Sequence, residues 1–284
     1  MENNFIPMYE EFEIRSLQEF LTNIPKKPNE YPWGFRGQER AEWKLQSSLF
    51  HKFSDKLSIA DLIEKGAFVA HNLEFGLLRI FKAYAIPHLT SVPSCDLAWL
   101  ALAQHHGLPT RLLDWTENPL VALFFALKDK ISNVENSPNK AIVWACLTPY
   151  GLIESENTLK VLDQNLIDKR KPSILNKSLY RYHPSHTTRR ITSQQGFFTI
   201  QSFDIPHLIP LEEQFGLDMT LMNVSSGNDE PEGPWFKKYI IPYENREEIL
   251  IELDSVGMNH YAIFPDLEGL AKKLCEDVRL QKKF

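Results

Sequence analysis

Arg36 and Gly37 form the first combination in the sequence that could do chemistry, within the run Trp33-Gly34-Phe35-Arg36-Gly37. A guanidinium group is a planar fork that can bind a phosphate or a carboxylate through two hydrogen bonds. A glycine beside it lets such a ligand approach the backbone closely. The pair therefore predicts an anion-binding position. The alternative is that Arg36 forms a structural ion pair with Asp114 or another acid.

Gln104, His105 and His106 stand where a predicted helix ends before Gly107. Histidine can act as a general acid or base near neutral pH. Adjacent residues of a helix point about 100° apart, so at most one of the two histidines shares a face with Gln104. A catalytic role for one histidine and a capping role at the helix end are the two alternatives.

Arg111 and Asp114 flank a predicted strand that continues into Trp115 and Thr116. Residues three apart in a strand face opposite sides, so Arg111 and Asp114 should meet different partners. Asp114 could orient the Arg36 guanidinium for a substrate, although the same ion pair would serve stability alone. Trp115 offers either a stacking surface or a core side chain.

Arg189 and Arg190 precede the turn Gln194-Gln195-Gly196 at a spacing that could bring a cation and an amide to one phosphate-bearing ligand. A solvated basic pair is the alternative. His183 and His186 show an HxxH interval, but the proline between them prevents helical alignment, and no third ligand is evident. We therefore predict no metal site.

Composition and missing motifs exclude several protein classes. A net charge of −6 gives no general attraction for polyphosphate, so nucleic-acid binding would require a local basic groove. Three widely separated cysteines without a CxxC pattern fit a reducing cytoplasm. No signal-peptide pattern or membrane-spanning apolar run occurs, so we expect a cytoplasmic protein without a membrane partner. The absence of GxGxxG, GxxxxGK[ST], HExxH and GxSxG removes the common dinucleotide, P-loop, zincin and serine-hydrolase readings.

The elements that must position these residues follow from caps, apolar periodicity and turn residues. Helices are expected over 16–23, 58–84, 94–104, 118–127, 244–256 and 266–274. Strands are expected over 33–37, 110–116, 140–147, 196–200, 238–241 and 261–264. An irregular crossing segment is expected over 148–192, and a turn-rich loop or lid over 225–234. This order predicts an α+β fold with a mixed or antiparallel central sheet of short strands flanked by helices.

The string from Leu100 to Phe125, LALAQHHGLPTRLLDWTENPLVALFF, resembles the FRG-domain family closely. That family is named for a Phe/Tyr-Arg-Gly motif, which Phe35-Arg36-Gly37 matches and Gln38 continues. Segments 194–200 and 264–270 are similar to its closing motifs, so the resemblance covers nearly the whole chain. It implies one domain over residues 1–284, with a helical lead-in (1–30), a motif-bearing core (33–126) and a C-terminal half (140–284).

A more distant similarity, of layout rather than of motif, is to the ADP-ribosyltransferase superfamily. In this comparison Arg36 resembles the first-strand arginine that contacts NAD, and Asp114-Trp115-Thr116 resembles the second-strand element. Gln195 occupies the place of the late catalytic glutamate. Glutamine cannot supply the negative charge that stabilises an oxocarbenium-like ribosyl centre, so another acid, such as Glu212 or Glu213, would be needed.

The resemblances imply a NAD-recognising enzyme that transfers ADP-ribose or hydrolyses NAD, as an effector or toxin in bacterial defence against phage. The expected NAD contacts are Phe35, Arg36, Gly37, Gln38, Gln104, Arg111, Trp115 and Thr116. The expected catalytic residues are Arg36, His105, His106, Asp114 and Gln195. A protein or a nucleic acid could serve as acceptor in place of water.

Two other functions stay open at this point. The first is a nuclease or RNA-binding effector that places Arg36, Arg111, Arg189 and His105 on a phosphate backbone. The second is a non-enzymatic nucleotide sensor whose 225–234 loop responds to the ligand.

Overall fold

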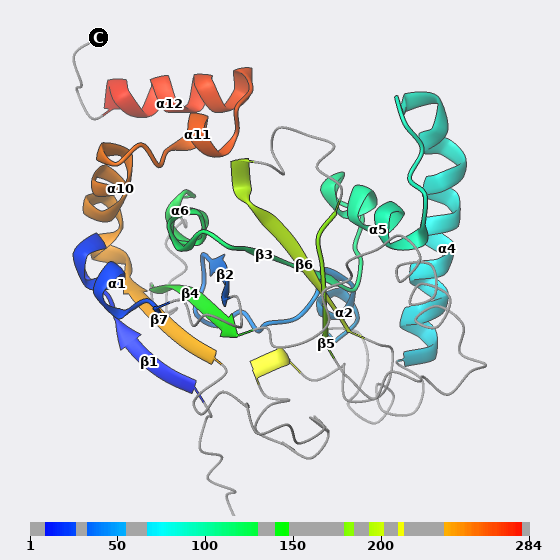
Figure 1. Cartoon of the computed structure of the whole chain (residues 1–284), viewed down its shortest axis with the longest axis horizontal. Coiled ribbons are helices and arrows are strands. Elements are labelled where there is room, and N and C mark those ends of the chain that lie inside the picture. Colours follow the sequence, from blue (N-terminus) through cyan, green and yellow to red (C-terminus); the bar gives the residue numbers. More distant parts are fainter. Residues whose placement is uncertain are drawn as a thin grey trace, which may run out of the picture.

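A seven-stranded sheet forms the centre of the computed structural model, which describes residues 9–26, 33–54, 67–129, 140–147, 179–184, 193–201, 210–212 and 236–279. The strand order is β1-β7-β4-β2-β3-β6-β5 (Figure 1). The strands are β1 (Tyr9–Glu13), β2 (Trp33–Gln38), β3 (Leu112–Thr116), β4 (Lys140–Leu147), β5 (Leu179–Tyr182), β6 (Gly196–Gln201) and β7 (Phe236–Pro242). β1 and β7 are parallel, and all other neighbours are antiparallel. The predicted α+β fold is confirmed, with a mixed sheet.

Two groups of helices cover one face of this sheet. The helices are α1 (Leu17–Asn23), α2 (Ser48–Ser54), α4 (Ala67–Ala85), α5 (Asp96–His105), α6 (Pro119–Leu127), α10 (Arg246–Ser255), α11 (His260–Ile263) and α12 (Leu267–Arg279), with short 3-10 turns η2 (Ile86–His88) and η4 (Tyr243–Asn245). α1, α6 and α10 share one apolar cluster with β2, β4 and β7. α4 and α5 share a second cluster with β3, β5 and β6. A third cluster fills the opposite face.

The contact between β2 and α6 is unusually close and depends on Gly37. A Cβ atom at position 37 would lie 2.0 Å from the carbonyl oxygen of Ala122 and 2.6 Å from the amide nitrogen of Ala126. Asn118 starts α6 by accepting a hydrogen bond from the Leu120 amide, as the Asn-Pro sequence predicts. The glycine therefore sets the distance between the strand that carries Arg36 and the helix beside it.

Several elements differ from the sequence-based expectation. The predicted strand over 261–264 is wrong, because Asn259 accepts hydrogen bonds from the Tyr261 and Ala262 amides and starts the helix α11 instead. The segment 148–192 was expected to be irregular, but it contains β5, which pairs with β6. Neither β1 nor α2 was expected. The 225–234 loop lies outside the described residues.

Candidate functional site

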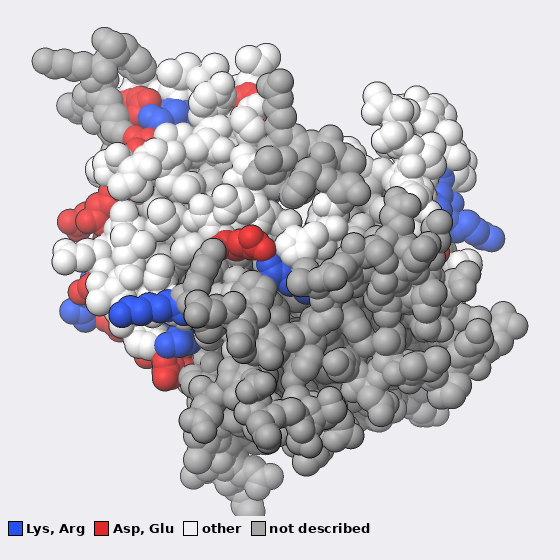
Figure 2. Space-filling view, viewed as in Figure 1, with Lys and Arg blue, Asp and Glu red and all other residues white. Residues whose placement is uncertain are grey.

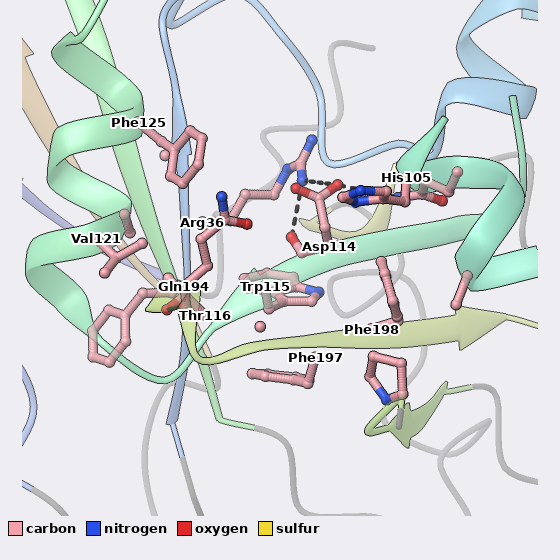
Figure 3. Close-up of a pocket in the computed structure, with 17 residues that line it drawn as sticks. Arg36, His105, Asp114, Trp115, Thr116, Val121, Phe125, Gln194, Phe197 and Phe198 are labelled. Carbon is pink, nitrogen blue, oxygen red and sulfur yellow. Dashed lines mark hydrogen bonds and ion pairs between the residues drawn. The ribbon is translucent and has the colours of Figure 1, made fainter. Parts of the chain in front are cut away.

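A cavity of about 330 Å³ lies where β2 and β3 separate. These two strands pair only at Phe35 and Thr116, so a gap opens beyond that point. α5 forms one side of the cavity and α6 the other (Figure 3). The lining residues are Phe35, Arg36, Gly37, Ala101, Gln104, His105, Asp114, Trp115, Thr116, Val121, Ala122, Phe125, Pro184, Gln194, Gly196, Phe197 and Phe198. Segments distant in the sequence therefore meet in one pocket.

Arg36 reaches across the gap between the two strands. Its Nη1 donates to the backbone oxygen of Asp114 at 2.9 Å and lies 2.7 Å from the carboxylate Oδ1 of the same residue. Its Nε is buried and has no hydrogen-bond partner among the described residues. A buried donor without a partner costs free energy, and such donors often mark a place where a ligand binds. Arg36 thus combines a structural contact with spare donor capacity beside the pocket.

Asp114 is the acid that lines the pocket, among the residues that the structure describes. Its side chain is 63% exposed, although neighbouring protein atoms still partly desolvate the carboxylate. That desolvation alone would raise the pKa, but the charge and hydrogen bond of Arg36 outweigh it and hold the pKa below its ordinary value. Asp114 is therefore a carboxylate at neutral pH, with one oxygen close to the arginine.

A short chain of hydrogen bonds fixes Gln104 against this carboxylate. Gln104 Nε2 donates to Asp114 Oδ1 at 3.4 Å, and Gln104 Oε1 accepts from the buried hydroxyl of Thr110. The Thr110 oxygen also accepts from the Leu112 amide at 3.2 Å. The start of β3 therefore sets the orientation of the Gln104 amide and of the carboxylate that it contacts.

The two histidines at the end of α5 have different surroundings. His105 lines the pocket together with Gln104. His106 is the C-cap residue, and its ring lies 6.4 Å from that of Phe81, outside the pocket lining. This agrees with the expectation that at most one histidine shares a face with Gln104.

Aromatic rings provide most of the apolar wall. Trp115 is buried and donates its Nε1 hydrogen bond to Thr199 at 2.9 Å, so its ring is fixed. Phe197 pairs with it across β3 and β6. Phe125 of α6 and Phe198 of β6 line other parts of the pocket (Figure 3). Trp115 and Phe197 are almost completely buried in the cluster on the opposite face of the sheet, so the flat surfaces left for a planar group beside Asp114 are the rings of Phe125 and Phe198.

The turn before β6 places Gln194, rather than Gln195, at the pocket. Thr116 Oγ1 donates to the backbone oxygen of Gln194 at 2.6 Å, and the Glu117 amide donates to the Gln195 oxygen at 3.1 Å. Gln195 has a φ of 47° and an exposed side chain, and it is not part of the lining. A residue in the left-handed conformation breaks the alternation of a strand. Spacing alone therefore could not predict whether Gln194 or Gln195 faces the pocket.

Two residues expected to contact the ligand point elsewhere. Gln38 accepts from Trp144 Nε1 at 3.0 Å and donates to the Lys44 oxygen, and it does not line the cavity. Arg111 is buried, and its Nε lies 3.1 Å from Glu74 Oε2. Arg111 and Asp114 therefore do meet different partners, as predicted, but only Asp114 faces the pocket.

The other acids considered for catalysis and the later basic residues do not add to the site. Glu212 accepts from the Leu45 amide at 3.0 Å and does not line the pocket. Glu213, His186, Arg189 and Arg190 lie outside the described residues. Across the described residues, no three His, Cys, Asp or Glu side chains are grouped so that they could hold a metal ion.

Sequence reasoning did not identify the contributions of α6 and β6 to the pocket. Val121, Ala122 and Phe125 belong to a helix that is apolar on every side, so its sequence does not show which side chains face a cavity and which are only packed. Phe197 and Phe198 belong to a predicted strand, but nothing in the pattern indicated which ring faces a cavity. The available signal was the aromatic pair directly after the Gln194-Gln195-Gly196 turn.

Comparison with known proteins gives one match. No curated protein and no solved structure matches the chain. Within the described ranges, no helix has the length and apolar character needed to cross a membrane. The family model of the FRG domain matches residues 31–135, a range that includes Arg36, Gln104, Asp114 and α6. The chain therefore contains an FRG domain, and the cavity between β2 and β3 is built largely from it.

Proposed function

We propose that the pocket binds NAD and that the protein cleaves the bond between nicotinamide and ribose, with water or a macromolecule accepting the ADP-ribosyl group. The observation that supports this most is the ion pair of Arg36 and Asp114 at an aromatic-walled cavity. A dinucleotide needs a cation for its pyrophosphate, a flat apolar surface for its rings and an anion near the ribosyl carbon. All three chemistries meet here.

Arg36 is suited to the pyrophosphate. A phosphate oxygen can take hydrogens from the exposed part of the guanidinium fork, because the Arg36 side chain is 20% exposed. The buried Nε, which has no partner among the described residues, would join this contact only if the side chain moves. In this proposal the phosphate competes with Asp114 for Arg36. Binding would then weaken the 2.7 Å contact between Arg36 and Asp114, so that Arg36 compensates less of the carboxylate's negative charge.

In this proposal Asp114 supplies the negative charge that the late catalytic glutamate supplies in the ADP-ribosyltransferase layout. When the C1′–N bond breaks, its electron pair leaves with neutral nicotinamide, and positive charge develops at C1′ and the ring oxygen. An ionised carboxylate nearby stabilises that charge. The water oxygen then bonds to C1′ and releases one proton, for which His105 is the nearby base. Gln104 keeps the carboxylate in place.

The cavity size limits how much of the dinucleotide is enclosed. Its volume of about 330 Å³ is at the low end of ligand pockets, which range from about 300 to 1,000 Å³. We therefore expect the nicotinamide ribose to be enclosed, with the adenosine half extending outside the cavity.

Nicotinamide release from NAD, followed by chromatography, tests the proposal directly. We expect Arg36→Ala to reduce the rate by about a hundredfold or more, as loss of one oriented charge donor does in other enzymes. Arg40→Ala is the matched control, because Arg40 lies just after β2, which carries Arg36, but pairs with Glu42 at 3.6 Å away from the pocket. The proposal would be refuted if the wild-type protein neither bound NAD nor released nicotinamide from it.

Calorimetric titration separates the enzyme from the sensor. NAD binding that depends on Arg36 but leads to no nicotinamide release would assign the pocket to nucleotide sensing. The nuclease alternative loses support, because Arg111 is buried against Glu74. On the face drawn in Figure 2, the basic side chains of the described residues are scattered among acidic ones.

A role as a toxin in anti-phage defence requires NAD cleavage inside the cell, in the cytoplasm where NAD is abundant. Controlled expression in bacteria tests this role. We expect the wild-type chain to lower cellular NAD and stop growth, and Asp114→Asn to do neither. Unchanged NAD levels on expression of an enzyme that is active in vitro would argue against a toxin.

A further inference from the structure

The helix α12 turns its charged face toward the rest of the protein. It lies at the periphery, next to α11 and α10 (Figure 1). Three of its side chains form ion pairs with those helices: Lys273 with Asp254 at 3.3 Å, Glu276 with His260 at 2.9 Å, and Arg279 with Glu247 at 3.0 Å. Gly269 is its buried residue. Charged contacts therefore dominate the attachment of this helix.

The apolar stripe of α12 points the other way, into solvent. Leu267 is 84% exposed, Leu274 44% and Val278 61%, and Ala271 between them is also exposed. Spacings of four, three and four residues place these side chains in one row along a helix. A surface helix usually has the reverse orientation, with its apolar row inward. An outward row of large apolar side chains indicates a binding surface.

The charges beside this stripe indicate which partner covers it. At about 100° per residue, Glu268 and Arg279 lie on the same flank of the row, near its opposite ends. In two antiparallel copies of α12 related by a two-fold axis, equal flanks face each other. Glu268 of each copy then lies beside Arg279 of the other, and Leu267 lies against Val278. A parallel arrangement would put the flank that carries Glu268 and Arg279 on opposite sides of the seam in the two copies, so these charges would not meet.

The middle of the stripe is also self-complementary. The same register places Ala271 of one copy opposite Leu274 of the other, so a small side chain meets a large one at two equivalent places. Glu268 also forms a pair with Lys272 at 3.0 Å, and both side chains are largely exposed. The Arg279 and Glu247 side chains are also exposed, at 36% and 58%. Exposed ion pairs are worth little, so both pairs can exchange for contacts across a dimer.

We propose that α12 is a homodimerisation helix that pairs antiparallel with α12 of a second copy through Leu267, Ala271, Leu274 and Val278. The helix spans about 20 Å, from 13 residues at about 1.5 Å each. A two-helix seam of that length buries less than a standard stable interface, so the dimer dissociates on dilution. The surface is separate from the pocket, and neither proposal depends on the other.

Sedimentation equilibrium over a wide concentration range tests the stripe. We expect the wild-type chain to dimerise and Leu274→Asp to raise the dissociation constant by about tenfold or more, since it puts two charges at the centre of the seam. Val256→Asp is the control. Val256 is an exposed apolar residue that follows α10, 58% exposed against 44% for Leu274, and its change should leave the dissociation constant unaltered.

A charge swap tests the antiparallel register. Glu268→Arg and Arg279→Glu should each weaken self-association, because each places like charges opposite each other. An equimolar mixture of the two variants should associate as tightly as the wild type, since the mixed dimer has opposite charges at both places. Circular dichroism confirms that each variant is folded. Arg279→Glu loses the contact with Glu247 both alone and in the mixture. Tighter association in the mixture therefore reports only the charge pairing across the dimer.

Three results would overturn the proposal. A wild-type chain that stays monomeric at every concentration removes the dimer. A mixture no tighter than its components removes the antiparallel pairing. Flotation of a monomeric wild-type chain with phosphatidylcholine or phosphatidylserine vesicles, abolished by Leu274→Asp, would assign the stripe to lipid instead.

Discussion

Arg36 Nη1 contacts both the carboxylate and the backbone oxygen of Asp114, at 2.7 Å and 2.9 Å. One guanidinium nitrogen thus bridges two strands that share a single residue pair. The backbone half of this contact does not need the carboxylate. A substitution of Asp114 can therefore separate the structural role of Arg36 from the chemistry of the pocket.

Asp114→Asn should leave the fold almost unchanged and remove most of the activity. The side chain is 63% exposed and the backbone contact to Arg36 remains, so we expect the free energy of unfolding to change by no more than about 1 kcal/mol. Loss of the charge near C1′ should lower nicotinamide release by about a hundredfold or more. Urea denaturation and initial rates of release measure the two effects.

The opposite pattern would assign Asp114 to stability. In that case Asp114→Asn lowers the free energy of unfolding by several kcal/mol while nicotinamide release per folded molecule stays the same. Gln38→Glu is a useful comparison for both the free energy of unfolding and nicotinamide release. Gln38 lies near Arg36 on β2, but its side chain binds Trp144 and the Lys44 backbone oxygen away from the pocket.

The pKa of Asp114 should rise when Arg36 is replaced by glutamine. In the wild-type protein partial desolvation raises the pKa, and Arg36 outweighs it so that the pKa lies below the ordinary value of 3.8. Without Arg36 only a backbone hydrogen bond of Asp114 still opposes desolvation, which is the larger effect, so the pKa should lie above the ordinary value. Titration of the carboxyl carbon by NMR measures this in Arg36→Gln, with Arg40→Gln as the control.

The sign of the linked stability follows from that low pKa. A carboxyl whose pKa is depressed on folding stabilises the protein above its unfolded pKa, and the contribution disappears as the pH falls through the folded pKa. The wild-type protein should therefore lose this contribution only below about pH 4, and Arg36→Gln should not show it. An Asp114 titration that is the same in both proteins would mean that Arg36 does not control the carboxylate.

Local signals predicted much of the framework that positions the pocket. Ser16 accepts from the Glu19 amide, and Asn118 accepts from the Leu120 amide, as their sequences indicate. The strands around Arg36 and Asp114 were also predicted, because their apolar runs end at glycine or at a capping residue. These features depend on residues only a few positions apart.

The parts that were missed depend on distant partners. β1 has the acid-rich sequence Tyr-Glu-Glu-Phe-Glu and forms only because it pairs with β7, far along the chain. The side of the turn that faces the pocket depends on the positive φ of Gln195 and on Thr116 holding the Gln194 oxygen. Such contacts leave no periodic pattern in the sequence, so the exchange of Gln195 for Gln194 could not be predicted.

Gly37→Ala should destabilise the protein strongly, because the new methyl group would lie 2.0 Å from the Ala122 oxygen. The Ala122 oxygen and the Ala126 nitrogen, 2.6 Å from the same methyl group, are backbone atoms of α6, so the helix must move away from β2. We expect a loss of about 3 kcal/mol or more in the free energy of unfolding. Calorimetry or urea denaturation measures it.

Gly76→Ala is the matched control for this prediction. A Cβ at position 76 meets nothing within 4 Å, and alanine favours a helix such as α4. The change should be neutral or stabilise by up to about 1 kcal/mol. Equal effects of the two substitutions would show that the approach of α6 to β2 does not depend on glycine.

The buried pair of Arg111 and Glu74 should be important for stability and unimportant for the pocket. Glu74 Oε2 lies 3.1 Å from Arg111 Nε, Glu74 Oε1 accepts from the Arg111 amide at 2.8 Å, and both side chains are almost completely buried. Glu74→Leu removes the acid that both the guanidinium and the amide of Arg111 contact, which should cost about 3 to 5 kcal/mol. Urea denaturation of the variant measures this loss.

The double substitution Glu74→Leu with Arg111→Met decides whether Arg111 also serves the site. Removing both charges avoids an unpaired buried ion, so stability should recover most of what Glu74→Leu loses. Nicotinamide release per folded molecule should then equal that of the wild type, because Arg111 does not line the pocket. A stable double variant with weak NAD binding would instead return Arg111 to the ligand contacts that its position in the motif first suggested.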